Sequence, residues 1–163
     1  MKKEELSLIN FTDLNKEQES RILTWRNNTN VRKWMYTSES ITNHNHQIFI
    51  EMLKTDTTKQ YYLVLKNSHE IGVIYFTNID LLSKQANFGI YSNPLNKGNG
   101  KSMMHILKNY GFNTLQLHTL TAEVFQENTI AYSLYINTGF KEIKTTLIKE
   151  QNIIQMELKN ENR

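Results

Sequence analysis

A strand, a glycine-containing loop and a helix follow one another between Gln85 and Leu107, and this segment constrains the fold more than any other. The loop holds the only proline, Pro94, and ends in Lys97-Gly98-Asn99-Gly100, where the helix begins. The first turn of a helix has backbone N–H groups without intrahelical partners, and the helix dipole adds partial positive charge there. Glycine lets the backbone adopt positive φ and approach a ligand closely. The segment therefore predicts an anion site, suited to phosphate, at the start of this helix.

Two familiar phosphate-binding loops do not fit the spacing. Gly100-Lys101-Ser102 match the end of a Walker A loop, but the glycine required at position 95 is replaced by Leu95. A dinucleotide-binding fingerprint requires a third glycine at position 103, where Met103 stands. The remaining pattern, Gly-x-Gly before a helix, is a weak signal by itself, and a plain tight turn explains it equally well.

Further along the chain, the order and spacing of several motifs resemble the acetyl-CoA-binding half of the GNAT family of N-acetyltransferases. The motifs are Gly98-Asn99-Gly100, the strand Leu120–Phe125, and Asn128-x-x-Ala131-x-x-Leu134-Tyr135-x-x-x-Gly139-Phe140. The resemblance implies acetyl-CoA as the cosubstrate, with its pyrophosphate on the Gly-x-Gly loop. The coenzyme-binding residues that it implies are Ile90, Tyr91, Lys97, Gly98, Asn99, Gly100, Lys101, Asn128 and Tyr135. Leu95 departs from the Arg or Gln usual in the family, which leaves the pyrophosphate to backbone amides, with Lys97 or Lys101 available to help.

The same resemblance assigns catalysis to Tyr135, which in the family protonates the departing thiolate. A phenol has an ordinary pKa of about 10 and a thiol of about 8.5, so the tyrosine is protonated at neutral pH. Without the motif, Tyr135 is more typical of a core aromatic residue, and Asn128 is equally typical of a helix N-cap. The strand before the glycine loop has no glutamate, so Glu123 on the neighbouring strand and His46 are the candidates for the general base.

The composition excludes several other classes of protein. The net charge is +3 and the isoelectric point about 9.0, but the lysines are dispersed, which argues against a nucleic-acid partner. The sequence has neither a run of 18 apolar residues nor the apolar stretch of a signal peptide, so a cytoplasmic protein without membrane contact is expected. The absence of cysteine excludes disulfides, cysteine-ligated zinc and an acyl-cysteine intermediate, and it favours direct attack within a ternary complex. His44 and His46 do not share a helix face, so no metal is predicted.

The patterning of the chain predicts an α+β fold in one domain covering residues 1–163. Caps at Asn15 and Thr42 predict helices over 16–27 and 43–54, with a shorter helical piece over 31–35. Two further helices are predicted from Gly100 onward and over 129–138. Alternation and turn residues predict strands over 6–11, 61–66, 71–77, 85–91, 117–125, 141–147 and 153–158.

The expected sheet is mixed and largely antiparallel, with about seven strands and about four flanking helices. The fourth and fifth strands are joined by a crossover helix, which predicts that they run parallel. They are expected to splay apart at their carboxyl ends, because the loops over 92–100 and 126–128 must both open there. We expect the acceptor side in residues 1–84, the acetyl-CoA-binding core in 85–140 and a C-terminal hairpin in 141–163.

The acceptor side carries a narrower resemblance, to the N-acetyltransferases of pseudaminic acid biosynthesis within the same family. It rests on Trp25-Arg26-Asn27, Val31-x-x-x-Met35, and the segments 41–50 and 71–79. Those enzymes acetylate the 4-amino group of a UDP-linked 4-amino-4,6-dideoxy sugar on the way to a sugar that decorates flagellin. The resemblance implies acceptor contacts from Arg26, Met35, Tyr36, His46 and Asn78. Arginine is suited to bind a diphosphate through two parallel hydrogen bonds.

Two alternative functions stay open on the sequence. Other members of the family acetylate ribosomal-protein N-termini and also carry Trp-Arg-Asn-like segments; that activity predicts an acidic or open peptide groove. A non-catalytic acyl-CoA-binding module is a different class, which Leu95 and the missing strand glutamate favour weakly and Tyr135 disfavours. The sequence has no signature of oligomeric state, and a homodimer is compatible with it.

Overall fold

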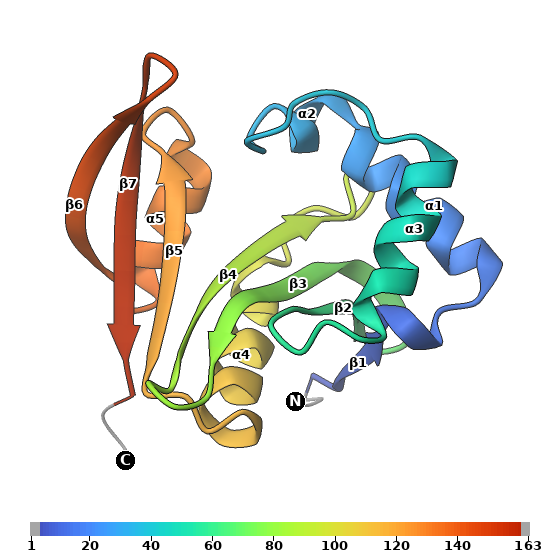
Figure 1. Cartoon of the computed structure of the whole chain (residues 1–163), viewed down its shortest axis with the longest axis horizontal. Helices are drawn as coiled ribbons and strands as arrows, with labels where there is room; N and C mark the ends of the chain where they lie inside the picture. Colours follow the sequence, from blue (N-terminus) through green and yellow to red (C-terminus); the bar gives the residue numbers. More distant parts are fainter. Residues whose placement is uncertain (1–3, 161–163) are drawn as a thin grey trace.

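A computed structural model describes residues 4–160 and places a seven-stranded sheet at the centre of the fold (Figure 1). The strands are β1 (Leu6–Asn10), β2 (Gln60–Lys66), β3 (His69–Asp80), β4 (Gln85–Ser92), β5 (Thr119–Phe125), β6 (Lys141–Ile148) and β7 (Gln151–Lys159). Their order in the sheet is β1-β2-β3-β4-β5-β7-β6, and neighbouring strands are antiparallel except for β4 and β5. The mixed, largely antiparallel sheet predicted from the sequence is confirmed.

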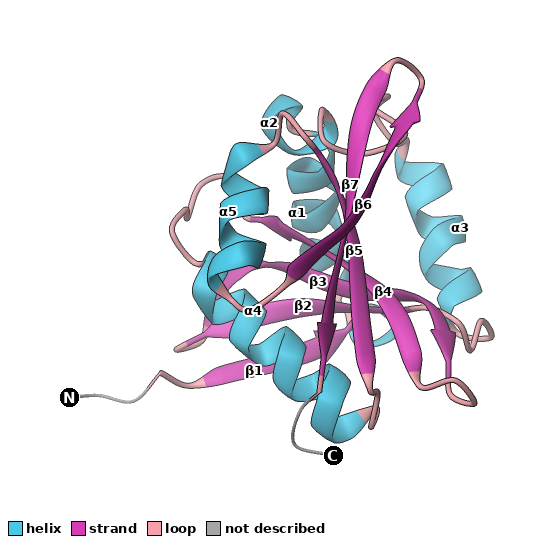
Figure 2. Ribbon diagram, turned by 90° about the vertical axis from the view of Figure 1, so that its left-hand side faces the viewer, coloured by secondary structure: helices cyan, strands magenta, loops and turns pink. Residues whose placement is uncertain are grey.

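Helices cover both faces of the sheet (Figures 1 and 2). They are α1 (Lys16–Asn27), α2 (Thr29–Arg32), α3 (Asn43–Leu53), α4 (Gly100–Asn109) and α5 (Thr129–Asn137). The described chain thus has five α-helices, and α2 is the short helical piece predicted over 31–35, which begins two residues earlier and ends at Arg32. One core packs α1 and α3 on the sheet through Ile22, Trp25 and Ile50, and the other packs α4 through Met103 and Leu107.

Side-chain caps fix where α1 and α3 begin. The Asn15 side chain accepts a hydrogen bond from the backbone N–H of Gln18 at 2.8 Å, and the Gln18 side chain accepts one from Asn15 N–H at 3.0 Å. Thr42 Oγ1 accepts from the backbone N–H of Asn45 at 3.1 Å. These bonds satisfy donors that the helix itself cannot pair. The predicted starts of both helices are confirmed.

Both predicted hairpins are present, but their turns are shorter than the sequence predicts. The β2–β3 turn consists of Asn67 and Ser68, and the β6–β7 turn consists of Lys149 and Glu150. All four residues have positive φ. Two-residue turns of this kind usually carry glycine, so the sequence does not signal how short they are. β3 continues through a bulge to Asp80, past its predicted end.

The parallel strands β4 and β5 pair over only part of their length. Asn87–Thr121 is the last of three residue pairs between them. Beyond it, β4 continues beside β3 and β5 continues beside β7, so the two strands diverge (Figure 1). The predicted splay is confirmed. It leaves the backbone of β4 after Asn87 without a strand neighbour on the β5 side.

Candidate functional site

The diverging half of β4 faces helix α5, which carries Tyr135. Tyr135 is 5% exposed and packs edge-to-face on Phe88 of β4, with ring centroids 5.3 Å apart. Burial raises the pKa of its hydroxyl above the ordinary value, so the phenol stays protonated at neutral pH. At the start of α5, the Asn128 side chain accepts a hydrogen bond from the backbone N–H of Ala131 at 3.3 Å. The N-cap role that the sequence left open for Asn128 is therefore present.

The glycine loop enters α4 beside the end of β4. Gly98 has a φ of +91°, and no atom lies within 4 Å of where its side chain would stand. Gly100 is constrained in a different way, because a Cβ there would lie 3.0 Å from the Leu134 side chain of α5, which would have to shift. Lys97 and Lys101 are exposed on this loop and Asn99 is buried. The loop thus presents an open backbone with two lysines beside the start of a ten-residue helix.

Three asparagines at three-residue spacing hold this loop, and the sequence analysis missed their role. Asn93 Oδ1 accepts from the backbone N–H of Leu95 at 2.9 Å, and Asn96 N–H donates to the carbonyl of Asn93 at 3.0 Å. Asn99 Nδ2 donates to the carbonyl of Asn96 at 2.9 Å, while its Oδ1 accepts from Lys66 Nζ at 3.4 Å. We call Asn93, Asn96 and Asn99 the asparagine ladder. It fixes the loop conformation with side chains from within the loop itself.

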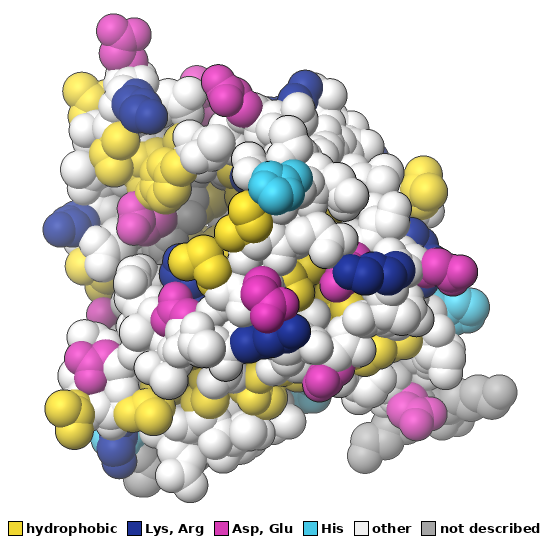
Figure 3. All heavy atoms as spheres, turned by 45° about the vertical axis from the view of Figure 1, so that its right-hand side comes forward, with side chains coloured by type: hydrophobic (Ala, Val, Ile, Leu, Met, Phe, Trp, Pro, Cys, Tyr) yellow, Lys and Arg dark blue, Asp and Glu magenta, His cyan; other side chains and the backbone are white. Residues whose placement is uncertain are grey.

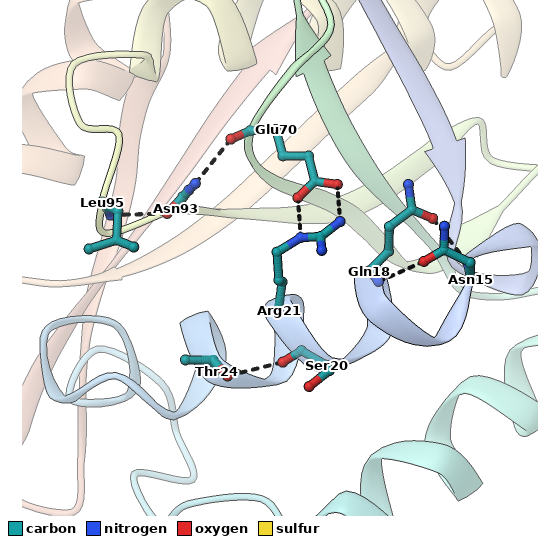
Figure 4. Close-up of polar contacts among 8 residues, drawn as sticks. All are labelled: Asn15, Gln18, Ser20, Arg21, Thr24, Glu70, Asn93 and Leu95. Atoms are coloured by element: carbon teal, nitrogen blue, oxygen red, sulfur yellow. Dashed lines mark hydrogen bonds and ion pairs between the residues drawn. The ribbon is translucent and has the colours of Figure 1, made fainter.

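The asparagine ladder is tied to the acceptor half of the chain through β3 (Figure 4). Asn93 Nδ2 donates to the carbonyl of Glu70 at 3.1 Å. The Glu70 carboxylate in turn accepts two bonds from the Arg21 guanidinium of α1, at 2.7 and 2.8 Å. Such a two-point pair fixes direction as well as distance. Helix α1, the start of β3 and the glycine loop are therefore held in one polar network.

The segment between α2 and α3 reaches across to the end of β5. Tyr36 donates its hydroxyl hydrogen to the Glu123 carboxylate at 2.5 Å, and its ring meets Phe125 edge-on at 5.7 Å. Arg26 Nη2 donates to the carbonyl of Thr37 at 3.1 Å, which anchors the segment to α1. Met35 packs against the core under α1 and α3. The structure thus brings together four residues predicted separately: Arg26, Met35, Tyr36 and Glu123.

A cluster of aromatic hydroxyls lies beside Arg26 on the same face of the sheet. The rings of Tyr61 and Tyr75 stack with centroids 4.7 Å apart, and Tyr91 of β4 lies 6.3 Å from Tyr75. Burial raises the pKa of all three hydroxyls, and the nearby Arg26 charge opposes that rise. Within residues 4–160, Arg26 Nη1 is buried and has no hydrogen-bond partner. We call Arg26, Tyr61, Tyr75 and Tyr91 the donor cluster.

The chain's eight tyrosines divide into two groups by their hydroxyl partners. Four bond to protein groups away from the donor cluster: Tyr36, Tyr62, Tyr110 and Tyr132. The hydroxyls of the other four have no hydrogen-bond partner in the described part of the chain: Tyr61, Tyr75, Tyr91 and Tyr135. Among the buried side-chain nitrogen and oxygen atoms of the described chain, only Arg26 Nη1 lacks a partner, so these four hydroxyls reach solvent. They lie around the diverging half of β4, where they are available to a ligand.

Tyr61 and Tyr75 were missed by the sequence analysis, although a signal for them exists. They are directly opposite each other in the β2–β3 ladder, and Tyr75 is opposite Gly89 in the β3–β4 ladder. Strict alternation places Tyr61 and Leu63 on one face of β2. That face is the one covered by α1 and α3, so the alternation pattern could have placed the Tyr61 ring on the helix-covered face, although not beside Arg26.

Two predicted acceptor residues, His46 and Asn78, make no hydrogen bond to the donor cluster within the described residues. His46 of α3 is 5% exposed, and burial lowers its pKa, with Glu19 of α1 opposing that effect. Asn78 is exposed at the bulge of β3, beyond the Thr77–Asn87 pair and therefore beside the paired half of β4. Ile90 and Tyr91, in contrast, lie on the unpaired stretch of β4, as the predicted coenzyme site requires.

The lowered pKa of His46 predicts acid sensitivity. A histidine whose pKa is lower in the folded state stabilises the fold fully above its unfolded pKa of about 6.5, and this contribution is lost as the pH falls from there through the folded value. We expect the melting temperature of a His46→Gln variant to fall less steeply than that of the wild type between pH 7 and pH 5. His44→Gln, at an exposed position on the same helix, is the matched control. Parallel slopes for all three proteins would contradict the prediction.

The face between β5 and the layer of α1 and α3 is hollowed, and hydrophobic side chains line the recess (Figure 3).

Over residues 4–160, no helix has the length and apolar character to cross a membrane. The same residues include no group of three or more His, Cys, Asp or Glu side chains placed to hold a metal ion.

Residues 9–141 match the family model of the acetyltransferase (GNAT) domain. The chain belongs to this family. Acetyltransferase PseH of Campylobacter jejuni subsp. jejuni serotype O:23/36 (strain 81-176) is 37% identical over 135 residues, which cover 83% of this chain and 84% of that protein. The GNAT resemblance seen in the sequence is confirmed, and with it the assignment of the chain as an acetyltransferase.

Solved GNAT structures agree with this assignment. The crystal structure of Campylobacter jejuni N-acetyltransferase PseH in complex with acetyl coenzyme A has a TM-score of 0.78 and 31% identity, covering 95% of this chain and 99% of that one. Spermidine N-acetyltransferase from Vibrio cholerae, in complex with CoA and spermine, has a TM-score of 0.86 at 21% identity, covering 94% and 95%. The second likeness shows the GNAT fold alone.

Proposed function

We propose that this protein transfers the acetyl group of acetyl-CoA to the 4-amino group of a UDP-linked 4-amino-4,6-dideoxy sugar in pseudaminic acid biosynthesis, for flagellin glycosylation. The similarity to PseH, whose structure was solved with acetyl coenzyme A, supports both the cosubstrate and the type of reaction. The resemblance of the acceptor-side segments supports the sugar nucleotide. Both substrates are cytoplasmic metabolites, so we place the reaction in the cytoplasm.

The donor cluster is the observation that carries this choice of acceptor. Arg26 supplies a permanent charge, and the pKa values of the three phenols are raised, so all four side chains donate hydrogen bonds at neutral pH. A site made of donors favours an acceptor rich in negatively charged oxygen atoms. A diphosphate provides such oxygens, and guanidinium groups match their geometry. A polyamine or a peptide amino terminus provides none.

The proposed position of acetyl-CoA is based on the splay between β4 and β5 and on the glycine loop. The β4 backbone at Ile90 and Tyr91 pairs with β3 on one side and, within the described residues, has no β5 neighbour on the other. The N–H and C=O groups that point away from β3 can therefore bond the amide groups of the pantetheine arm. The backbone N–H groups at Gly98 and Gly100, with Lys97 and Lys101 beside them, would hold the pyrophosphate. The asparagine ladder fixes the conformation of this loop. The Arg or Gln side chain that is usual in the family is replaced by Leu95, so the backbone amides must bind the pyrophosphate.

The chemistry proceeds by direct attack in a ternary complex. The acceptor ammonium first loses a proton to Glu123, directly or through water, and the resulting amine attacks the thioester carbonyl carbon. A C–N bond forms, the C–S bond breaks, and Tyr135 gives its proton to the departing sulfur. The nitrogen, now bonded to the acetyl carbon, releases its second proton to water, and Tyr135 regains a proton from solvent. Glu123 lies on the acceptor side through its bond to Tyr36, and Tyr135 lies on the α5 side of the splay. His46 remains the second candidate for the base.

Thiol release from acetyl-CoA tests the proposed acceptor. The purified protein is offered the UDP-linked 4-amino-4,6-dideoxy sugar, an N-terminal ribosomal-protein peptide and spermidine in parallel. We expect release with the sugar nucleotide alone. Release with only the peptide or only spermidine would reject the proposal.

The proposed function is compatible with a homodimer, because all eight residues of the edge strand β6 are exposed.

Removal of one residue of the asparagine ladder is expected to weaken coenzyme binding. Asn99→Ala removes a buried amide that joins Asn96 to Lys66, so the loop loses its fixed conformation. We expect the Kd of acetyl-CoA to rise roughly five- to tenfold, which corresponds to one or two hydrogen bonds. Isothermal titration calorimetry measures this, with Asn152→Ala on the exposed β6–β7 hairpin as the matched control. An unchanged Kd in Asn99→Ala would show that the ladder does not shape the coenzyme site.

A further inference from the structure

Tyr75 lies where the acceptor half and the coenzyme half of the molecule meet. Its ring rests directly on β4 at Gly89, where an added Cβ would stand 2.1 Å from Cζ and 2.2 Å from the hydroxyl oxygen. Gly89 comes two residues after Asn87, the last β4 residue paired with β5. The missing side chain of Gly89 thus makes room for the Tyr75 hydroxyl at the point where the two strands part.

The surroundings of Tyr75 place its hydroxyl between the other functional groups. It belongs to the donor cluster with Arg26, and its ring is stacked on Tyr61. Its charge state also contributes, after burial, to the raised pKa values of Tyr36 and Tyr135. Tyr75 packs with the core under α1 and α3, whereas Tyr135 packs with the core under α4 and α5. Two protonated phenols therefore approach the splay from opposite faces of the sheet.

We propose that Tyr75 contacts the acceptor and orients its amino group toward the thioester. Its hydroxyl donates a hydrogen bond to an oxygen of the sugar, between the anionic part held by Arg26 and the reacting amine. This inference rests on the proposed function. It assigns Tyr75 to the acceptor and not to the coenzyme, because the ring lies on the α1 and α3 face together with Arg26.

Tyr75→Phe tests the contact while it keeps the ring and its stacking. We expect kcat/KM for the sugar nucleotide to fall roughly tenfold, the size of one lost hydrogen bond near the upper end of the usual range. The Kd of acetyl-CoA, its slow hydrolysis without acceptor and the melting temperature should stay unchanged, because the hydroxyl has no partner within residues 4–160.

Tyr62→Phe is the matched control from the neighbouring strand. The Tyr62 hydroxyl bonds to Gln60 and to Tyr110, each at 2.5 Å, within the core on the α4 side. Its loss should lower the melting temperature and leave kcat/KM for the acceptor unchanged. The two variants thus separate a role in acceptor binding from a role in folding. Tyr75→Phe should change only kcat/KM for the acceptor, and Tyr62→Phe should change only the melting temperature.

Three outcomes decide the inference. A Tyr75→Phe enzyme with wild-type kcat/KM for the acceptor overturns it. An equal loss in acceptor-independent hydrolysis or in acetyl-CoA affinity also overturns it, because the hydroxyl would then serve the coenzyme side. If the wild type acetylates a different acceptor, the proposed function fails, while a selective loss of activity toward that acceptor in Tyr75→Phe still supports the contact.

Discussion

Tyr135→Phe is expected to lower kcat roughly 10²- to 10⁴-fold, the usual contribution of a positioned general acid. The ring is buried against Phe88 and Phe140, so phenylalanine preserves the packing and removes only the hydroxyl. That hydroxyl has no hydrogen-bond partner within residues 4–160, so stability should hardly change. Steady-state thiol release gives kcat, calorimetry gives the Kd of acetyl-CoA, and we expect only kcat to change.

The control for this experiment lies on the same helix. Tyr132 is one turn away and donates its hydroxyl hydrogen to Glu142 at the surface. Tyr132→Phe should therefore keep full turnover. If Tyr135→Phe also turns over at the wild-type rate, Tyr135 is a packing residue and another group protonates the thiolate. A wild type that binds acetyl-CoA without turnover would instead favour the non-catalytic acyl-CoA module.

Arg26→Met should lower kcat/KM for the sugar nucleotide roughly 10- to 100-fold, because hydrogen bonds to charged groups are among the stronger ones in proteins. Arg26 Nη1 is buried without a partner in the described chain, so the anionic part of the acceptor would supply its only bond. Arg26→Lys should recover little of this loss, since lysine lacks the two-pronged geometry. Initial rates at several acceptor concentrations measure the effect.

A shortened acceptor makes this test specific. The same amino sugar without UDP lacks the diphosphate, so Arg26→Met should cost almost nothing with it. Arg21→Met, on the same helix but paired with Glu70 near the surface, should leave the KM for the sugar nucleotide unchanged within about twofold. An equal loss with both acceptors would show that Arg26 acts by holding the segment at Thr37, and not by binding phosphate.

The coenzyme half of the site was largely predictable because its signals are local. The strand, the glycine loop and the helix from Gly100 form one continuous stretch, and the crossover helix dictates parallel strands. The splay followed from two loops that had to open at the same end, and the end of the β4–β5 pairing at Asn87 confirms it. Capping at Asn15 likewise depends on residues only three apart in sequence.

The acceptor side was harder to predict because it depends on contacts between distant segments. Tyr36 and Glu123 are 87 residues apart, and no sequence pattern around either residue predicts their hydrogen bond. Tyr61 and Tyr75 look like ordinary strand aromatics until the register sets them opposite each other and beside Arg26. The hairpins at Asn67 and Lys149 were predicted, but not the two-residue length of their turns, because neither turn contains glycine.

The sequence by itself determined the family, the order of elements and the residues of the glycine loop, because each depends on short-range spacing and backbone preference. Only the tertiary structure decided which side chains are left without partners. Within residues 4–160, the Tyr75 hydroxyl and one guanidinium nitrogen of Arg26 have no hydrogen-bond partner because of how the sheet and helices pack around them. Hydrogen-bond satisfaction depends on all the neighbours of a group at once, and most of those neighbours come from other strands and helices.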